Sequence, residues 1–159
     1  MPLLPVPIPT TDAWVHKDLT LSEIAIKYLT NQGDATTAGP RELGSGVTLT
    51  LQGASIGSTS IYSSAIPAGL YRISYYARIT RAATTSSSLT IAFDWTDGGV
   101  GQTFTGAAIT GNTTTTYQQA SVTFRSDGNV PITYSTTYVS VGATSMQHNF
   151  LLVLEQLNA

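Results

Sequence analysis

The sequence contains no cysteine, which excludes disulfide bonds and thiolate metal sites. Charge is also scarce, because Asp, Glu, Lys and Arg make up only 10% of the 159 residues, compared with about a quarter in typical soluble domains. The net charge of −2 argues against nucleic-acid binding, which requires a clustered basic surface. No apolar run approaches the ~20 residues of a membrane-spanning helix. We therefore expect neither nucleic acid nor a membrane among the partners.

The few charges are unevenly placed along the chain. Both lysines, Lys17 and Lys27, lie near its start, and most of the acidic residues precede Gly44. Beyond Gly46 the sequence is rich in Thr, Ser, Gly and aromatic residues. This change predicts an N-terminal arm with a linker over residues 1–46 and a separate domain over residues 47–159.

The arm begins with prolines that alternate with apolar residues, MPLLPVPIPT. Proline restricts its own φ and the residue before it, so we expect an extended strap. The strap lacks a basic n-region and cannot form a helical h-region, so we expect use without export by a signal of its own. Thr20 and Glu23 fit a capping box, which predicts a short helix over about residues 21–29. Such a helix is too short to be stable alone.

We predict that the apolar side chains of the arm bind a partner protein. The strap carries Leu, Val and Ile between its prolines, and the prolines lower the entropic cost of ordering it on a partner. The predicted partner-binding residues are Leu3, Leu4, Val6, Ile8, Trp14, Leu21, Ile24 and Tyr28.

From Val47 onward the hydrophobic pattern has a period of two, which is typical of β-strands. Eight candidate strands are bounded by turn residues: about 47–52, 55–63, 69–80, 88–96, 100–109, 117–126, 130–141 and 146–157. Eight strands without a second helical pattern predict an all-β, antiparallel, eight-stranded sandwich of the jelly-roll type. An immunoglobulin-like sandwich is the alternative, although its Cys–Trp–Cys core is absent.

The last strand departs from this alternation because it is apolar on both faces. It is either a central strand that is covered on both sides, or a strand whose outer face contacts another subunit. We predict a homo-oligomer whose interface includes Phe150, Leu151, Leu152, Val153 and Leu154.

No arrangement of residues in the sequence indicates catalysis. His16 and His148 lie far apart and have no acidic partners at metal-ligand spacing. Asp94 and Asp97 flank Trp95 and could form a carboxylate pair, but a turn residue and a solvent-facing residue explain them more simply. No serine lies in a G-x-S-x-G motif. We therefore predict no catalytic residue, no metal site, no cofactor and no enzymatic activity.

Tyrosines are the remaining distinctive group in the predicted domain. Tyr75 and Tyr76 are neighbours on one strand and must point to opposite faces, so one of them is expected to be exposed. Exposed strand aromatics can bind a glycan or a protein, whereas in many sandwiches they lie at the rim of the core. The sequence leaves both interpretations open.

Several segments resemble small accessory virion proteins of tailed bacteriophages. The resemblance covers Ala65–Val100 and Tyr138–Leu157, and its most specific parts are GLYRISYYARIT, ATTSSSLT, DWTDGG and LLVLEQL. It implies a virion structural protein, assembled in the host cytoplasm and without a catalytic motif. By analogy with viral β modules, a trimer is the favoured oligomer.

The resemblance implies two placements in the particle. In the first, the protein is a capsid decoration or cement protein that clamps neighbouring major capsid subunits through its arm. In the second, it is a fibre, neck or tail component with a receptor-binding or adaptor role. A carbohydrate-binding module is a third interpretation, and it requires a sheet face lined with aromatic residues.

Overall fold

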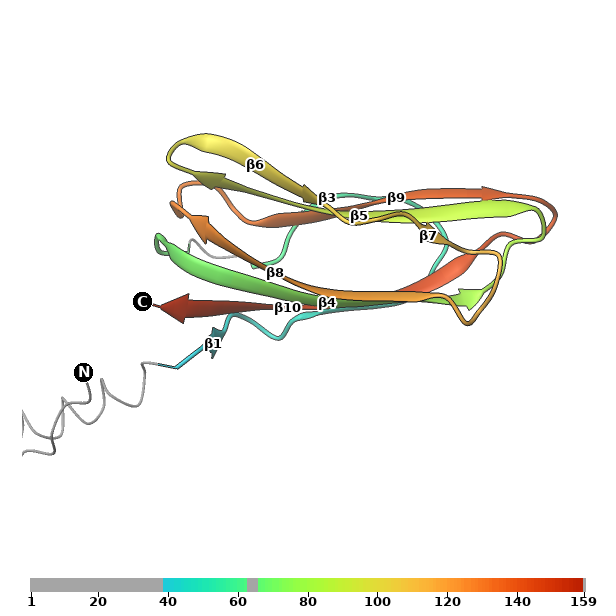
Figure 1. The fold of residues 1–159 in the computed structure, drawn as a ribbon, viewed down its shortest axis with the longest axis horizontal. Helices are drawn as coiled ribbons and strands as arrows, with labels where there is room; N and C mark the ends of the chain where they lie inside the picture. Colours follow the sequence, from blue (N-terminus) through green and yellow to red (C-terminus); the bar gives the residue numbers. More distant parts are fainter. Residues whose placement is uncertain (1–38, 63–65, 159) are drawn as a thin grey trace, which may run out of the picture. The chain divides into compact units, whose positions relative to one another are not determined.

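The period-two pattern that begins at Val47 folds into strands throughout the part of the chain that the computed structural model describes, residues 39–62 and 66–158 (Figure 1). The strands are β1 Arg41–Glu42, β2 Val47–Gln52, β3 Ile56–Ser60, β4 Gly69–Arg81, β5 Ser86–Asp97, β6 Val100–Thr105, β7 Ile109–Thr110, β8 Tyr117–Ser126, β9 Thr133–Val141 and β10 Gln147–Asn158. The arm residues and the helix predicted over residues 21–29 lie outside the described residues.

The strands form two antiparallel sheets that pack face to face (Figure 1). One sheet has the order β2–β10–β4–β8, and the short β1 also pairs with β10. The other has the order β3–β9–β5–β6, and the short β7 also pairs with β5. The partners are nested along the chain, since β2 pairs with β10, β3 with β9, β4 with β8 and β5 with β6. This nesting is the jelly-roll arrangement, so the predicted fold is confirmed.

Alternation along the strands divides core from surface as the sequence predicted. In β4, Tyr71, Ile73 and Tyr75 are buried, whereas the residues between them are not. The same pattern in β5 buries Leu89, Ile91 and Phe93. Side chains from both sheets therefore meet in one continuous hydrophobic core, as expected for two sheets that each bury one face.

Two boundaries differ from the prediction. Arg41 and Glu42 were expected in a linker, but they pair with β10, and Leu43 is buried in the core. The β domain therefore begins before Val47. The predicted strand over residues 100–109 is interrupted and forms two strands, β6 and β7. Thr105 pairs with Ala92 and Ile109 pairs with Leu89, so an advance of four residues along this segment faces an advance of only three residues along β5. The extra residue interrupts the ladder at Gly106.

Candidate functional site

The outer surfaces of the two sheets differ in chemistry. The outer surface of β10, β4 and β8 is here called the arginine face, and it carries Arg72, Arg78, Arg125, Tyr76, Tyr117, Leu151 and Val153. The opposite outer surface, on β9, β5 and β6, carries mainly hydroxyl-bearing side chains such as Thr90, Thr103, Thr133 and Thr137. The arginine face is therefore the surface with aromatic, apolar and cationic groups together.

Strand register brings the tyrosines of the arginine face together. Tyr76 lies opposite Leu151 on β10, and Arg78, two residues further along β4, lies opposite Tyr117 on β8. The Tyr76 and Tyr117 rings are 6.0 Å apart between centroids and inclined by 30°. Tyr76 is thus the outward member of the Tyr75–Tyr76 pair, while Tyr75 is buried against Phe93.

The arginines on this face have different partners. Arg72 Nε donates to Glu155 Oε2 at 2.8 Å, which lowers the pKa of Glu155 and raises that of Arg72. Arg125 lies 3.9 Å from Asp97, and both side chains are largely solvent-accessible, so this contact is weak. Arg78 has no ion pair within residues 39–62 and 66–158. Its charge therefore stands uncompensated beside two tyrosine rings.

The last strand is both a central strand and a contributor to the outer surface. Phe150, Leu152 and Leu154 fill the core and cannot contact another subunit, which corrects that part of the predicted interface. Val153 points outward but is half-buried, since Gly46 lies close to it. Leu151 is 40% exposed, and it is the apolar residue of this strand that remains most open to a partner. The oligomer itself stays a prediction, and the predicted arm residues lie outside the described part.

Two acidic side chains, Asp127 just after β8 and Asp94 within β5, are hydrogen-bonded to the β5–β6 hairpin. Asp127 accepts hydrogen bonds from Thr96 Oγ1 at 2.5 Å and from the Gly99 N–H at 2.9 Å, and these bonds lower its pKa. Asp94 accepts from Thr103 Oγ1 at 2.6 Å. Within the described ranges, no group of three or more His, Asp or Glu residues could hold a metal ion. Asp97 ends β5 and opens the turn, as the sequence suggested, and Asp127 braces this turn through the Gly99 N–H.

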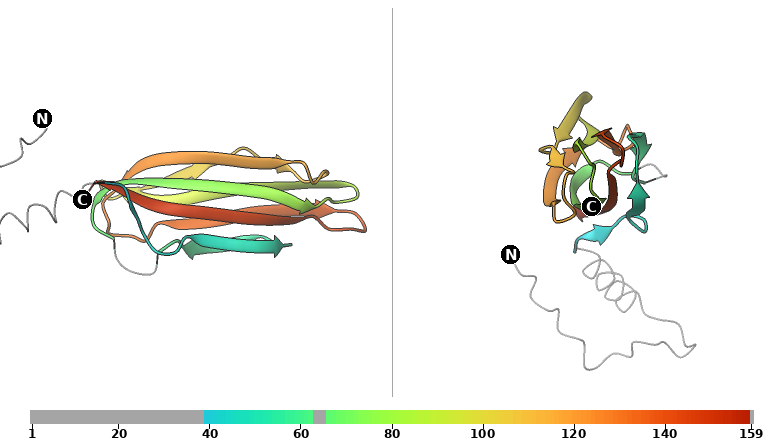
Figure 2. Two further views of the ribbon diagram at one scale, coloured as in Figure 1. Left: turned by 90° about the horizontal axis from the view of Figure 1, so that it is seen from below. Right: turned by 90° about the vertical axis from the view of Figure 1, so that its right-hand side faces the viewer.

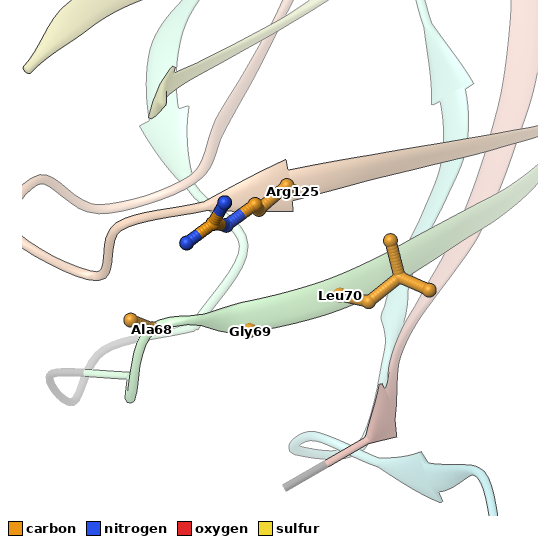
Figure 3. A pocket seen from close by; sticks show the side chains of 4 residues that line it. All are labelled: Ala68, Gly69, Leu70 and Arg125. Atoms are coloured by element: carbon orange, nitrogen blue, oxygen red, sulfur yellow. The ribbon is translucent and has the colours of Figure 1, made fainter. Parts of the chain in front are cut away.

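An open hollow lies at the end of the sandwich where β4 begins and β8 ends. It is lined by Ala68, Gly69, Leu70 and Arg125 (Figure 3). The guanidinium of Arg125 is the charged group in this lining, and it already contacts Asp97. The hollow offers no pair of groups for acid–base or nucleophilic chemistry.

No helix of the described residues is long and apolar enough to cross a membrane.

The burial of one polar residue, His148, was not predicted from the sequence. His148 is fully buried, and neither ring nitrogen has a hydrogen-bond partner among the described residues. Its ring lies 6.1 Å from that of Tyr138, between centroids. Burial lowers the pKa of His148, because the charged imidazolium loses its hydration there. Only the alternation along β10 could have suggested this position, since His148 has the same parity as Phe150.

Comparisons with known proteins do not assign a family. No protein family and no curated protein matches the sequence. Among solved structures, a family 16 carbohydrate-binding module is 13% identical over 69% of this chain and 74% of its own, with a TM-score of 0.33. The CBM22-1–GH10 modules of Clostridium thermocellum xylanase 10B, complexed with xylohexaose, are 14% identical over 75% of this chain and 26% of theirs, with a TM-score of 0.35. Likenesses at this level carry no conclusion about ligand or function.

Proposed function

We propose that this chain is a non-catalytic attachment protein of a virus particle, which binds another virion protein through the arginine face. The observation that carries the proposal is the row of exposed Leu151 and half-buried Tyr76 in the middle of this face, with Arg78 and the exposed Tyr117 beside it. Tyrosine and arginine dominate the energetics of protein interfaces, whereas lysine is depleted there. The chain beyond residue 27 has no lysine.

The position of this row lowers the entropic cost of binding a partner. Leu151 belongs to β10, which is paired on one edge with β4 and on the other with β2. Tyr76 belongs to β4, which is paired with β10 and β8. Side chains on strands paired along both edges are held rigidly, so little conformational entropy is lost when they dock.

The resemblance to accessory phage proteins supports a place in the virion. Within that setting, we propose a capsid decoration protein whose arm, residues 1–29, clamps neighbouring major capsid subunits. Repetition of the contact over a particle would strengthen weak individual contacts through multivalency. A tail, neck or fibre position is the alternative within the same class, and copy number in whole particles by cryo-electron microscopy separates the two.

Leu151→Asp is expected to weaken binding to capsids at least tenfold, because a carboxylate would be desolvated at the centre of the contact. The measurement is decoration of capsids that lack the protein, quantified by co-sedimentation, with a chain lacking residues 1–29 measured alongside. Thr50→Asp is the matched control, since it adds the same charge at an exposed position of β2 in the same sheet, away from the apolar row and from β8. Full decoration by both Leu151→Asp and the shortened chain would refute the proposal.

A glycan-binding function is the second candidate, and the tyrosine pair with Arg78 favours it. The exposed Tyr117 ring and the half-buried Tyr76 ring on the adjacent strand offer a surface on which the CH groups of a pyranose can stack. Arg78, which has no ion pair among the described residues, can bind a sugar carboxylate. The amide side chains of Gln119 and Asn149 flank the rings and could bond hydroxyl groups.

For this candidate, binding to polygalacturonate is expected to fall about tenfold in Arg78→Gln and to be abolished in Tyr117→Ala. The probe is compared with its fully methyl-esterified form, which keeps the sugar backbone but lacks the carboxylates. Isothermal titration calorimetry gives both affinities, and Arg125→Gln serves as the control for general charge. Equal binding of the two polymers, or no binding of either, excludes an acidic-sugar site at these residues.

A further inference from the structure

Strand β8 presents a long edge to which no described strand is paired. It lies at one margin of its sheet, followed by β4, β10 and β2, as the left view of Figure 2 shows. Its ten residues contain no proline and no lysine, and its pairing with β4 runs from Tyr117 to Ser126 without a bulge. Proteins usually protect such edges with prolines, lysines or bulges, because an open edge is a template for another strand.

The backbone groups on this open edge can be identified from the pairing with β4. The Ile79 N–H donates to the Thr116 carbonyl at 3.0 Å, just beyond the first pair of the ladder, Arg78 with Tyr117. Hydrogen-bonded pairs alternate with non-bonded pairs in an antiparallel ladder. Even-numbered residues of β8 therefore bond to β4, and the odd-numbered ones direct N–H and C=O away from it. These are Tyr117, Gln119, Ser121, Thr123 and Arg125.

The sandwich is also open beneath this edge. Ala120 lies on the core-facing side of β8, opposite the buried Tyr75, and is nevertheless exposed. Farther along the strand, Phe124 on the same side is buried. The other strands at the margins of the two sheets are shorter than β8, with six residues or fewer.

We propose that β8 pairs with β8 of a second copy of this chain, antiparallel and about a two-fold axis at Ser121. Ser121 is the middle residue of the five that face the open edge. Centring the pair there sets Gln119 opposite the partner's Thr123 and Tyr117 opposite the partner's Arg125. Every N–H and C=O group on the two edges then has a partner, and the two sheets become one continuous sheet. A contact of this kind closes on itself.

The distribution of charge along β8 favours this orientation. Arg125 is the charged residue of β8 and lies near one end of the strand. Antiparallel pairing keeps the two Arg125 side chains at opposite ends and places each beside the partner's exposed Tyr117, where a cation–π contact is favourable. Parallel pairing would set the two arginines side by side.

The proposed β8–β8 contact does not depend on the virion assignment. It replaces the trimer, which was suggested by analogy, with a two-fold dimer.

The decisive experiment uses the absence of cysteine from the sequence, because Ser121→Cys places one thiol per chain on the proposed axis. Residues of a hydrogen-bonded pair have Cα atoms ~5.5 Å apart, within the range of disulfides. Under mild oxidation, the full-length variant is expected to convert mostly to a disulfide-linked dimer. Gln119→Cys alone should remain uncrosslinked, whereas Gln119→Cys combined with Thr123→Cys should crosslink.

A second experiment tests the same register without oxidation. Gln119→Lys with Thr123→Lys sets like charges opposite each other across the axis, so sedimentation analysis should show monomers. Gln119→Lys with Thr123→Glu sets opposite charges together and should keep the dimer. A monomeric or trimeric unmodified protein, or crosslinking as efficient through Gln119→Cys alone as through Ser121→Cys, would overturn the proposal.

Discussion

Gly128→Ala is expected to lower the free energy of unfolding by about 3 kcal/mol. Gly128 has a φ of 74°, a conformation that costs an L-residue roughly 1–2 kcal/mol. A new Cβ would lie 2.4 Å from the Ile66 carbonyl oxygen and 2.9 Å from the Ala68 nitrogen. Both atoms belong to the backbone and cannot rotate away, so overpacking adds roughly 1–3 kcal/mol. Chemical denaturation at neutral pH measures the loss.

Gly98→Ala separates the two contributions. Gly98 also has a positive φ, 60°, but a Cβ there would meet no atom within 4 Å. This variant should therefore lose only about 1 kcal/mol, the conformational part alone. If both alanine variants are destabilised equally, the close approach of the Ile66–Ala68 segment to Gly128 is not what requires glycine.

Acidification is expected to destabilise the protein through His148. Burial lowers the pKa of His148 below its usual value of 6.5, so the folded state keeps the ring neutral where the unfolded state protonates it. The contribution of neutral His148 to the free energy of unfolding is fully present above pH 6.5. It decreases as the pH falls towards the folded pKa, by up to about 1.4 kcal/mol per pH unit. Denaturation curves between pH 7.5 and 4.5 would record this slope.

The His148→Leu variant should lose this slope and be at least as stable at pH 7.5. It replaces two buried nitrogens that have no hydrogen-bond partner in the described part of the chain by an apolar group. The described carboxylates with lowered pKa, Glu155 and Asp127, have ordinary values of 4.5 and 3.8. The stability that ionised Glu155 and Asp127 contribute is lost only as the pH falls below those values, which lie at or below the lower end of the interval from pH 7.5 to 4.5. His16→Gln controls for the second histidine. An unchanged slope in His148→Leu would show that other groups cause the acid sensitivity.

The strands could be predicted from the sequence because alternation is a local signal. The predicted range 117–126 coincides with β8, and 69–80 differs from β4 by one residue. The same period of two separates buried from outward side chains along β4 and β5. The interruption at Gly106 could not be predicted, since it depends on how many residues the partner strand β5 offers between two pairs. Nor could the pairing of Arg41 and Glu42 with β10, because a two-residue strand has no detectable period.

The candidate site was only partly accessible to sequence reasoning. The outward direction of either Tyr75 or Tyr76 follows from their adjacency, but the partner of Tyr76 does not. Tyr117 lies 41 positions further along the chain, and only the register of β4 with β8 brings the rings together. The apolar run at Phe150–Leu154 was noticed, yet the sequence could not say which residues the opposite sheet would cover.

By itself, the sequence determined the class of protein: no disulfides, little charge, and an all-β domain with alternating faces. These properties follow from residue types and their spacing, which act over a few positions. The tertiary structure alone decided that β8 is a sheet margin, that Leu151 stays exposed between covered neighbours, and that His148 is buried with no hydrogen-bond partner among the described residues. Each of these depends on hydrogen bonds and packing between strands that are distant in sequence, and no local pattern specifies which strands will meet.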